Sequence, residues 1–167
     1  NQPAKSKKQG PKKQYIYSMH DLSILSIVII IAVMLLFSAF FSGMEIAFLG
    51  RNRLREEIDR KQSPMFNYIA DIFSRNSSNY ITTILVGNNI ALVIYSMTMA
   101  LILERLFGME NPLGQTIIST IVILFIGEYI PKSVVRHNPN FYYSALSPVI
   151  FFFYIILIKI NTFSIPS

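Results

Sequence analysis

Four long apolar stretches alternate with polar segments along the chain, and this pattern predicts its main elements. They extend over residues 22–49, 79–103, 113–131 and about 139–161. A helix rises about 1.5 Å per residue, so each of the first three can cross a hydrocarbon core about 30 Å thick. In the fourth, Pro148 and the nearby tyrosines and Lys159 favour a helix at the membrane interface, with a fourth crossing as the alternative. We therefore predict an all-α membrane protein with three transmembrane helices and a juxtamembrane belt helix.

A charged segment, residues 51–75, joins the first two stretches and indicates which side of the membrane it occupies. It carries six basic residues among acidic ones, and Ser63-Pro64 divides it into two predicted surface helices, a helical hairpin. The next connection, residues 104–114, has only Arg105 as a basic residue. Basic loops stay in the cytosol, so we expect the hairpin to be cytosolic. The Lys-rich residues 1–20 would then lie outside, which conflicts with the same rule.

Composition agrees with a membrane protein and narrows the possible chemistry. Of the 167 residues, 52% are hydrophobic and only 14% are charged, and the mean hydropathy is +0.45. The net charge of +6 lies mostly in segments that flank apolar stretches, so it indicates topology and not nucleic-acid binding. Cysteine is absent and the two histidines are far apart in sequence, so any bound metal must be held by oxygen.

Residues 1–20 form a separate, polar segment that cannot bury enough apolar surface to fold alone. We expect a flexible basic leader there and a single membrane domain over residues 21–163. The chain begins with Asn and stops just after an apolar stretch, so we expect a fragment or a processed product.

Glu128 is the acidic residue of the third apolar stretch and the first candidate for a functional role. A carboxylate inside the membrane costs roughly 2.5–3.5 kcal/mol on insertion scales, so it usually faces a protein interior or an ion path. Pro131 lacks an amide hydrogen and crowds the carbonyl of Gly127, which should leave regular helical pairing. A carboxylate beside a freed carbonyl suits a cation. The alternative is a structural ion pair between Glu128 and Lys132, one turn later.

The first apolar stretch carries a polar stripe, because spacings of four and three residues place Ser38, Ser42 and Glu45 on one face of a helix. We interpret Ser42 and Glu45 as functional or as supporting a site. Ser38 and Gly43 are explained equally well by close packing of helices, which small residues permit in membranes.

The second stretch contains Gly87, Asn88 and Asn89 well inside its apolar run. Adjacent helical residues point about 100° apart, so the two amides cannot serve one point equally. One of them could bind an ion while the other joins two helices. The alternative for either amide is an interhelical hydrogen bond, worth about 0.6–2 kcal/mol in membranes.

Depth in the membrane connects these polar residues. Counted along the helices, Ser42, Glu128 and Asn88 lie about 30, about 20 and about 18 Å below the outer surface. With some tilt, all three can meet in the inner half of the membrane. Hydroxyl, amide and carboxylate oxygens from three helices would form a hard-cation site open to the cytosol, and Mg²⁺ accepts such ligands.

Several motifs occur in the same order as in a known family. They are Phe40-Phe41-Ser42-Gly43-Met44-Glu45-Ile46-Ala47, Thr83-Ile84-Leu85-Val86-Gly87-Asn88-Asn89, Gly127-Glu128-Tyr129-Ile130-Pro131-Lys132 and Arg136-His137-Asn138-Pro139. Together they closely resemble the transmembrane domain of the CNNM/CorC family of Mg²⁺ transporters over residues 22–163. Within that family the chain is most similar to bacterial members, and we consider the gliding-motility-associated branch as its subgroup.

The resemblance implies a homodimer in the bacterial cytoplasmic (inner) membrane, with three spans, a cytosolic hairpin and a belt helix in each subunit. It implies Mg²⁺ export driven by Na⁺ entry from an inward-facing site. By motif, Ser42, an Asn of the pair and Glu128 match the family's cation ligands, with backbone carbonyls completing the shell. Met44 stands where the family often has a small residue. The family's cytosolic nucleotide-binding CBS domains are not in this sequence.

Two other functions are open at this stage. The chain could be a Mg²⁺-sensing or envelope-assembly component that keeps the fold, contacts other envelope proteins and transports nothing. An intramembrane hydrolase is the weaker choice, because no stretch offers a Ser-His or paired-Asp arrangement and Glu45 with Glu128 is poor evidence for one. We therefore expect no enzyme activity.

Overall fold

The structure is a computed structural model that describes residues 23–164, and within this range all regular structure is helical. The predicted all-α class is therefore confirmed. The leader predicted at residues 1–20 lies outside the described residues.

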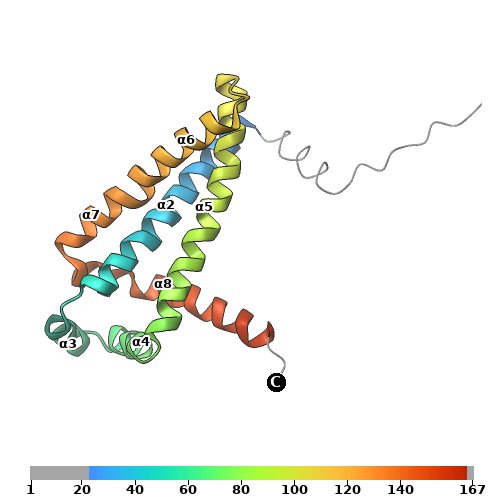
Figure 1. The fold of residues 1–167 in the computed structure, drawn as a ribbon. Helices are drawn as coiled ribbons and strands as arrows, with labels where there is room; N and C mark the ends of the chain where they lie inside the picture. Colours follow the sequence, from blue (N-terminus) through green and yellow to red (C-terminus); the bar gives the residue numbers. More distant parts are fainter. Residues whose placement is uncertain (1–22, 165–167) are drawn as a thin grey trace, which may run out of the picture.

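Three long helical rods run side by side (Figure 1). The first is α2 (Ile24–Gly50) and the second is α5 (Ser77–Phe107). The third is continuous but changes type, from α6 (Pro112–Val122) through the π-helix η1 (Ile123–Tyr129) to α7 (Ile130–His137). Helix α2 packs against α5, η1 and α7, so it is the central rod.

Local sequence explains where these rods begin and end. The Ser23 hydroxyl accepts a hydrogen bond from the Ser26 amide and caps α2, and the Asn111 side chain caps α6 in the same way before Pro112. Helix α5 ends at Gly108, whose φ of 60° lies in the left-handed region that favours glycine.

Two short helices, α3 (Arg53–Gln62) and α4 (Pro64–Arg75), lie together at one end of the rods (Figure 1). The Asn52 side chain caps α3, and the Ser63 hydroxyl accepts from the Phe66 amide and caps α4. We call this end of the molecule the α3–α4 end and the opposite one, where Gly108 joins the second rod to the third, the Gly108 end.

The last helix, α8 (Pro139–Ser164), runs across the α3–α4 end of the rods instead of along them (Figure 1). It continues through Pro148 without a break in the helix. By length and composition, four helices of the described chain could cross a membrane: Ile24–Gly50, Ser77–Phe107, Pro112–His137 and Pro139–Ile160. The chain is thus a multi-pass membrane protein.

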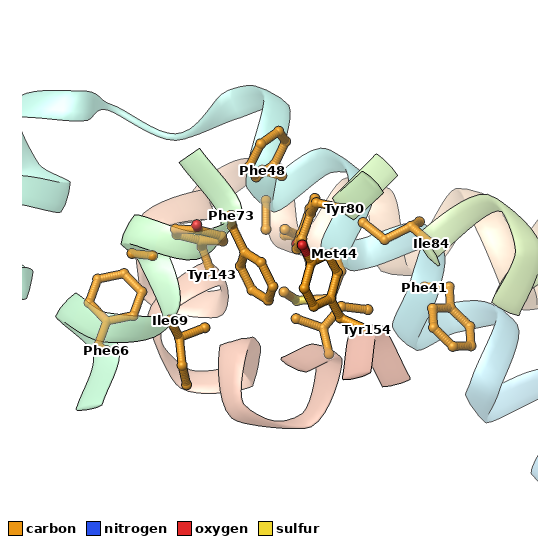
Figure 2. Packing of buried hydrophobic residues seen from close by; sticks show 14 residues of the cluster. Phe41, Met44, Phe48, Phe66, Ile69, Phe73, Tyr80, Ile84, Tyr143 and Tyr154 are labelled. Carbon is orange, nitrogen blue, oxygen red and sulfur yellow. The ribbon is translucent and has the colours of Figure 1, made fainter. Parts of the chain in front are cut away.

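An aromatic cluster forms the core of the α3–α4 end (Figure 2). The ring of Tyr80 from α5 lies 4.3 Å from the ring of Phe48 in α2 and 4.5 Å from that of Phe73 in α4, between ring centroids. Tyr143 and Tyr154 of α8 complete the cluster. Each such pair contributes about 0.5–1.5 kcal/mol beyond area burial, so the cluster ties α4 and α8 to the rods.

Glycines allow close contact between the rods. A Cβ atom added to Gly87 of α5 would lie 2.3 Å from the ring of Phe41 in α2, which is far below a normal contact. One added to Gly43 would lie 3.2 Å from Cγ2 of Val135 in α7. At Gly87 the neighbouring rod occupies the space that a side chain would need, whereas at Gly43 a methyl group would require a shift of a few tenths of an ångström.

Candidate cation site

The third rod departs from α-helical geometry where it carries Gly127 and Glu128. Residues Ile123–Tyr129 form a π-helix, and the Ile130 amide at its end donates to the carbonyl of Phe125, five residues earlier. Pro131 follows directly and has no amide hydrogen to donate. Wide turns of this kind are frequent at functional sites because they change the direction of backbone and side-chain groups.

Ser38, Asn88 and Gly127 bring the three rods together at one point. The buried Ser38 hydroxyl donates to Oδ1 of Asn88 at 2.9 Å, which joins α2 to α5. A Cβ atom added to Gly127 would lie only 3.1 Å from the same hydroxyl oxygen. The backbone of η1 therefore passes directly against Ser38, and hydroxyl and amide oxygens lie beside the turn that carries Glu128.

Ser42 lies one turn further along α2 and is also buried, with 2% of its surface exposed. The sequence predicted a meeting of Ser42, an Asn and Glu128, whereas the interhelical hydrogen bond to the Asn comes from Ser38. The reason is geometric: Ser38 and Ser42 share one helical face, so the relative height of the rods decides which of them faces Asn88.

The two adjacent amides have different surroundings. Asn88 is partly buried and directed at α2, while Asn89 is exposed on another face of α5. This division follows from the angle of about 100° between neighbouring helical residues. Asn88 is thus the amide that joins the three-rod contact.

Glu45, Glu128 and Lys132 form a charged group on the α3–α4 side of this contact. Nζ of Lys132 lies 3.4 Å from Oε2 of Glu45 in α2 and 4.0 Å from Oε2 of Glu128 in η1. The Glu128–Lys132 ion pair that the sequence left open is therefore present at the limit of ion-pair distance. Lys132 is nearer to Glu45, a partner that the sequence did not predict.

A hollow of about 590 Å³ opens beside this group and is lined by Leu124, Phe125, Glu128, Tyr129 and Lys132. All three charged side chains are about one third exposed at the surface of the described chain. In residues 23–164, no three His, Asp or Glu side chains lie together as a metal-binding cluster. The oxygen donors that meet at the three-rod contact are instead neutral: the Ser38 hydroxyl and the Asn88 amide, beside the backbone of η1 at Gly127. The Glu128 carboxylate follows Gly127 in η1 and lies with Lys132 at the hollow, whose lining includes neither Ser42 nor Asn88.

A second polar group supports the α3–α4 end, and the sequence analysis did not find it. Glu56 is 4% exposed and accepts from Nε of Arg51 at 2.7 Å and from Nη2 of Arg60 at 2.6 Å. The Arg51 guanidinium also lies 3.8 Å from the centroid of the Phe48 ring. The spacing of Arg60 from Glu56 was a usable signal for one ion pair, but nothing local indicated that the pair is buried.

Asn52 and Asn140 connect the same region to α8. The Asn52 amide donates to Oδ1 of Asn140 at 2.8 Å, and Nδ2 of Asn140 donates to the Asn52 carbonyl at 2.9 Å. The two residues are 88 positions apart, so no sequence pattern could have paired them.

Comparisons with known proteins agree with this architecture. A family model described as the Cyclin M transmembrane N-terminal domain matches residues 29–164. The chain is 28% identical over 103 residues to "UPF0053 inner membrane protein YfjD" of Escherichia coli K12, covering 62% of this chain and 24% of that protein. It is 31% identical over 100 residues to "UPF0053 protein MG146 homolog" of Mycoplasma pneumoniae, covering 58% and 23%.

The matched region spans about a quarter of each of these relatives. The family match includes all residues of the three-rod contact and of the charged group beside it. The residues that carry the resemblance in the sequence, Ser42 with Gly43, Gly87 with Asn88, and Gly127 with Glu128, all lie within it. The chain belongs to the CNNM family, whose model describes the Cyclin M transmembrane N-terminal domain.

Proposed function

We propose that this domain moves Mg²⁺ across the membrane through a site between its three rods. One observation carries the proposal: Ser38, Asn88 and Gly127 bring α2, α5 and η1 into contact beside Glu128. A transport site needs ligands from elements that can shift against one another, and these three groups come from three separate rods. Neutral oxygens with one or two carboxylates are the donors that Mg²⁺ accepts while keeping several waters.

The proposed ligands are Ser42, Asn88, Glu128 and the carbonyl of Gly127, with Asn89 as the alternative amide and Ser38 added to the set. Each is a hard oxygen donor. Gly43, Gly87, Pro131, Glu45 and Lys132 support the site through packing, backbone geometry and charge. The ion is cargo, so we propose no enzyme activity and no resident cofactor.

We further propose that α2, α5 and the third rod cross the membrane, while α8 lies at the interface as a belt helix. Its course across the α3–α4 end supports this arrangement (Figure 1). Basic residues gather at that end, in residues 51–75 and in α7, whereas Arg105 lies near the Gly108 end. The α3–α4 end would then face the cytosol, and the site would open inward.

Export driven by Na⁺ entry, a homodimer and the bacterial inner membrane complete the proposal. They rest on family membership, and the printed name of the Escherichia coli relative, an inner membrane protein, supports the location. Assignment to the gliding-motility-associated branch stays a prediction.

The test is Mg²⁺ flux in liposomes that contain the complete protein. Replacing Glu128 by Gln keeps the shape of the side chain and removes its charge. Because hydrogen bonds and ligand contacts of a charged group are worth about 1.5–3 kcal/mol, we expect flux to fall by roughly tenfold or more. Glu110→Gln, an exposed carboxylate near the Gly108 end, is the matched control and should leave flux unchanged.

Equal flux for the parent protein and Glu128→Gln would overturn the proposal. Mg²⁺ binding without flux, together with robust co-purification of another envelope protein, would favour the non-transporting alternative.

A further inference from the structure

Lys132 contributes a positive charge beside the candidate cation site, where it contacts two carboxylates. Its ammonium group lies between carboxylates from two different rods, Glu45 on α2 and Glu128 on η1. The distance to Glu45 is 3.4 Å and the distance to Glu128 is 4.0 Å. Glu128 is thus the more distant of the two carboxylates from the ammonium group.

The positive charge of Lys132 should oppose the binding of a cation to Glu128. A divalent cation that binds Glu128 meets a positive charge already close to the same carboxylate, and the two cations repel each other. The repulsion is reduced if the lysine moves away. Its flexible four-carbon stem permits such a movement, and the nearer carboxylate of Glu45 offers it a place to go.

The hollow beside η1 leaves room for Lys132 to move away from Glu128. The hollow beside η1 is lined by both Glu128 and Lys132, and both side chains are only partly buried. The shared carboxylate therefore faces the hollow, while Glu45 approaches Lys132 from the side of α2.

We propose that Lys132 acts as an internal counter-cation: it is shared by Glu45 and Glu128 when no ion is bound, and withdraws to Glu45 when Mg²⁺ binds Glu128. Lys132 is in this view a positioning residue, and Glu45 acts through it instead of binding the ion itself. The inference rests on the proposed function, since it assumes that Glu128 is a Mg²⁺ ligand.

The proposal gives the two charged residues opposite effects. Lys132→Met removes a competitor, so Mg²⁺ should bind more tightly, whereas a merely structural lysine would weaken binding when lost. Glu45→Gln removes the place to which the lysine withdraws, so Mg²⁺ should bind more weakly. In the Lys132→Met background, Glu45→Gln should have no further effect, because the residue through which it acts is gone.

The experiment measures the Mg²⁺ concentration that gives half-maximal thermal stabilisation of the complete protein in detergent. For a partly exposed charge pair we expect Lys132→Met to lower this concentration by about three- to fivefold and Glu45→Gln to raise it by a similar factor. Lys132→Arg keeps the charge and should resemble the parent protein. Arg136→Gln removes an exposed positive charge one turn along α7 and should change nothing.

The outcomes separate this inference from the proposed function. Unchanged or weaker binding in Lys132→Met overturns the inference while Mg²⁺ binding itself stands. An equal loss from Glu45→Gln with and without Lys132 also overturns it, because Glu45 would then be a direct ligand. If neither the parent nor Lys132→Met responds to Mg²⁺ in a way that Glu128→Gln abolishes, the proposed function fails as well.

Discussion

The hydroxyl of Ser38 links the first two long helices at a buried point. It donates to Asn88, and it occupies the space where Gly127 of the third rod would carry a side chain, so all three rods come together around this oxygen atom. A buried polar group in that position needs its partner, because leaving it without a hydrogen bond would cost free energy.

Ser38→Ala should therefore destabilise the fold by about 0.6–2 kcal/mol, the usual worth of an interhelical hydrogen bond in membranes. The free energy of unfolding in mixed detergent measures the loss. Ser96→Ala is the matched control, because the exposed Ser96 hydroxyl donates to the Leu92 carbonyl within its own helix. Equal losses from the two substitutions would contradict the role given to Ser38.

Gly87 provides a second test at this scale. Adding one methyl group there should push the buried Phe41 ring away and cost about 1–3 kcal/mol, the usual penalty of overpacking. In Gly50→Ala the new Cβ would lie 3.6 Å from Cβ of Pro139, an ordinary contact, so this control should be tolerated. The same unfolding measurement compares them, and a harmless Gly87→Ala would show that the Phe41 ring can move aside and does not fix the spacing of the rods.

Sequence spacing placed the polar residues of α2 on one helical face but did not predict their partners. A stripe of Ser38, Ser42 and Glu45 follows from helical periodicity alone. Whether Asn88 meets Ser38 or Ser42 depends on how far one rod is displaced along the other. That displacement is set by close packing, such as Phe41 against Gly87, which one sequence does not reveal.

Among the elements, the connection between α2 and α3 combines charge and aromatic packing. Glu56 of α3 holds Arg51 and Arg60 while almost fully buried, and Arg51 covers the Phe48 ring. Removing one partner of a buried ion pair leaves the other charge without solvation or a counter-charge, which destabilises the fold.

Glu56→Ala should accordingly cost about 3–5 kcal/mol, the effect of removing one partner from a buried ion pair. Asp71→Ala breaks the exposed Asp71–Arg75 pair of α4, which is also an acidic residue paired with an arginine, and should cost at most about 1 kcal/mol. Equilibrium unfolding compares the two variants. Similar losses would mean that water reaches Glu56 and screens it.

The sequence also indicated that the third rod departs from α-helical hydrogen bonding near Gly127. Pro131 cannot donate to a carbonyl four residues earlier, so the pairing around Gly127 had to change. Which change the chain makes was not predictable, because a kink, a freed carbonyl and a π-helix all satisfy the same missing hydrogen bond. The adjacent ends of α5 and α6 depend on the local capping residues Gly108 and Asn111.

For the whole molecule, the course of α8 decides the topology. It is apolar enough to cross a membrane, yet it runs across the end of the other helices (Figure 1). As a belt helix it would keep both of its ends on the same side as α3, whereas a fourth crossing would place its C-terminal end on the side of Gly108.

Single cysteines can distinguish the two arrangements, because the chain has none of its own. We expect Glu57→Cys in α3 and a cysteine added after Ser167 to react with a membrane-impermeant maleimide from one side only, the cytosolic one. Glu110→Cys near the Gly108 end should react from the other side. Labelling of the C-terminal cysteine together with Glu110→Cys would establish a fourth crossing and contradict the belt.

Apolar length identified every candidate membrane helix but could not decide how α8 lies. Length and hydropathy are the same for a crossing helix and for one that encircles a bundle. The difference comes from contacts between distant residues, the Asn52–Asn140 pair and the aromatic cluster around Tyr80 and Tyr143.

The wide turn in the third rod also sets the rotational phase of everything after it. An α-helix advances about 100° per residue, so one residue absorbed by a looser turn changes which side chains of Ile130–His137 look towards the central rod. Val135 opposite Gly43 and Lys132 opposite Glu45 both depend on that offset. A change of backbone winding at Ile123–Tyr129 would therefore alter the charge pattern a full turn away without replacing any charged residue.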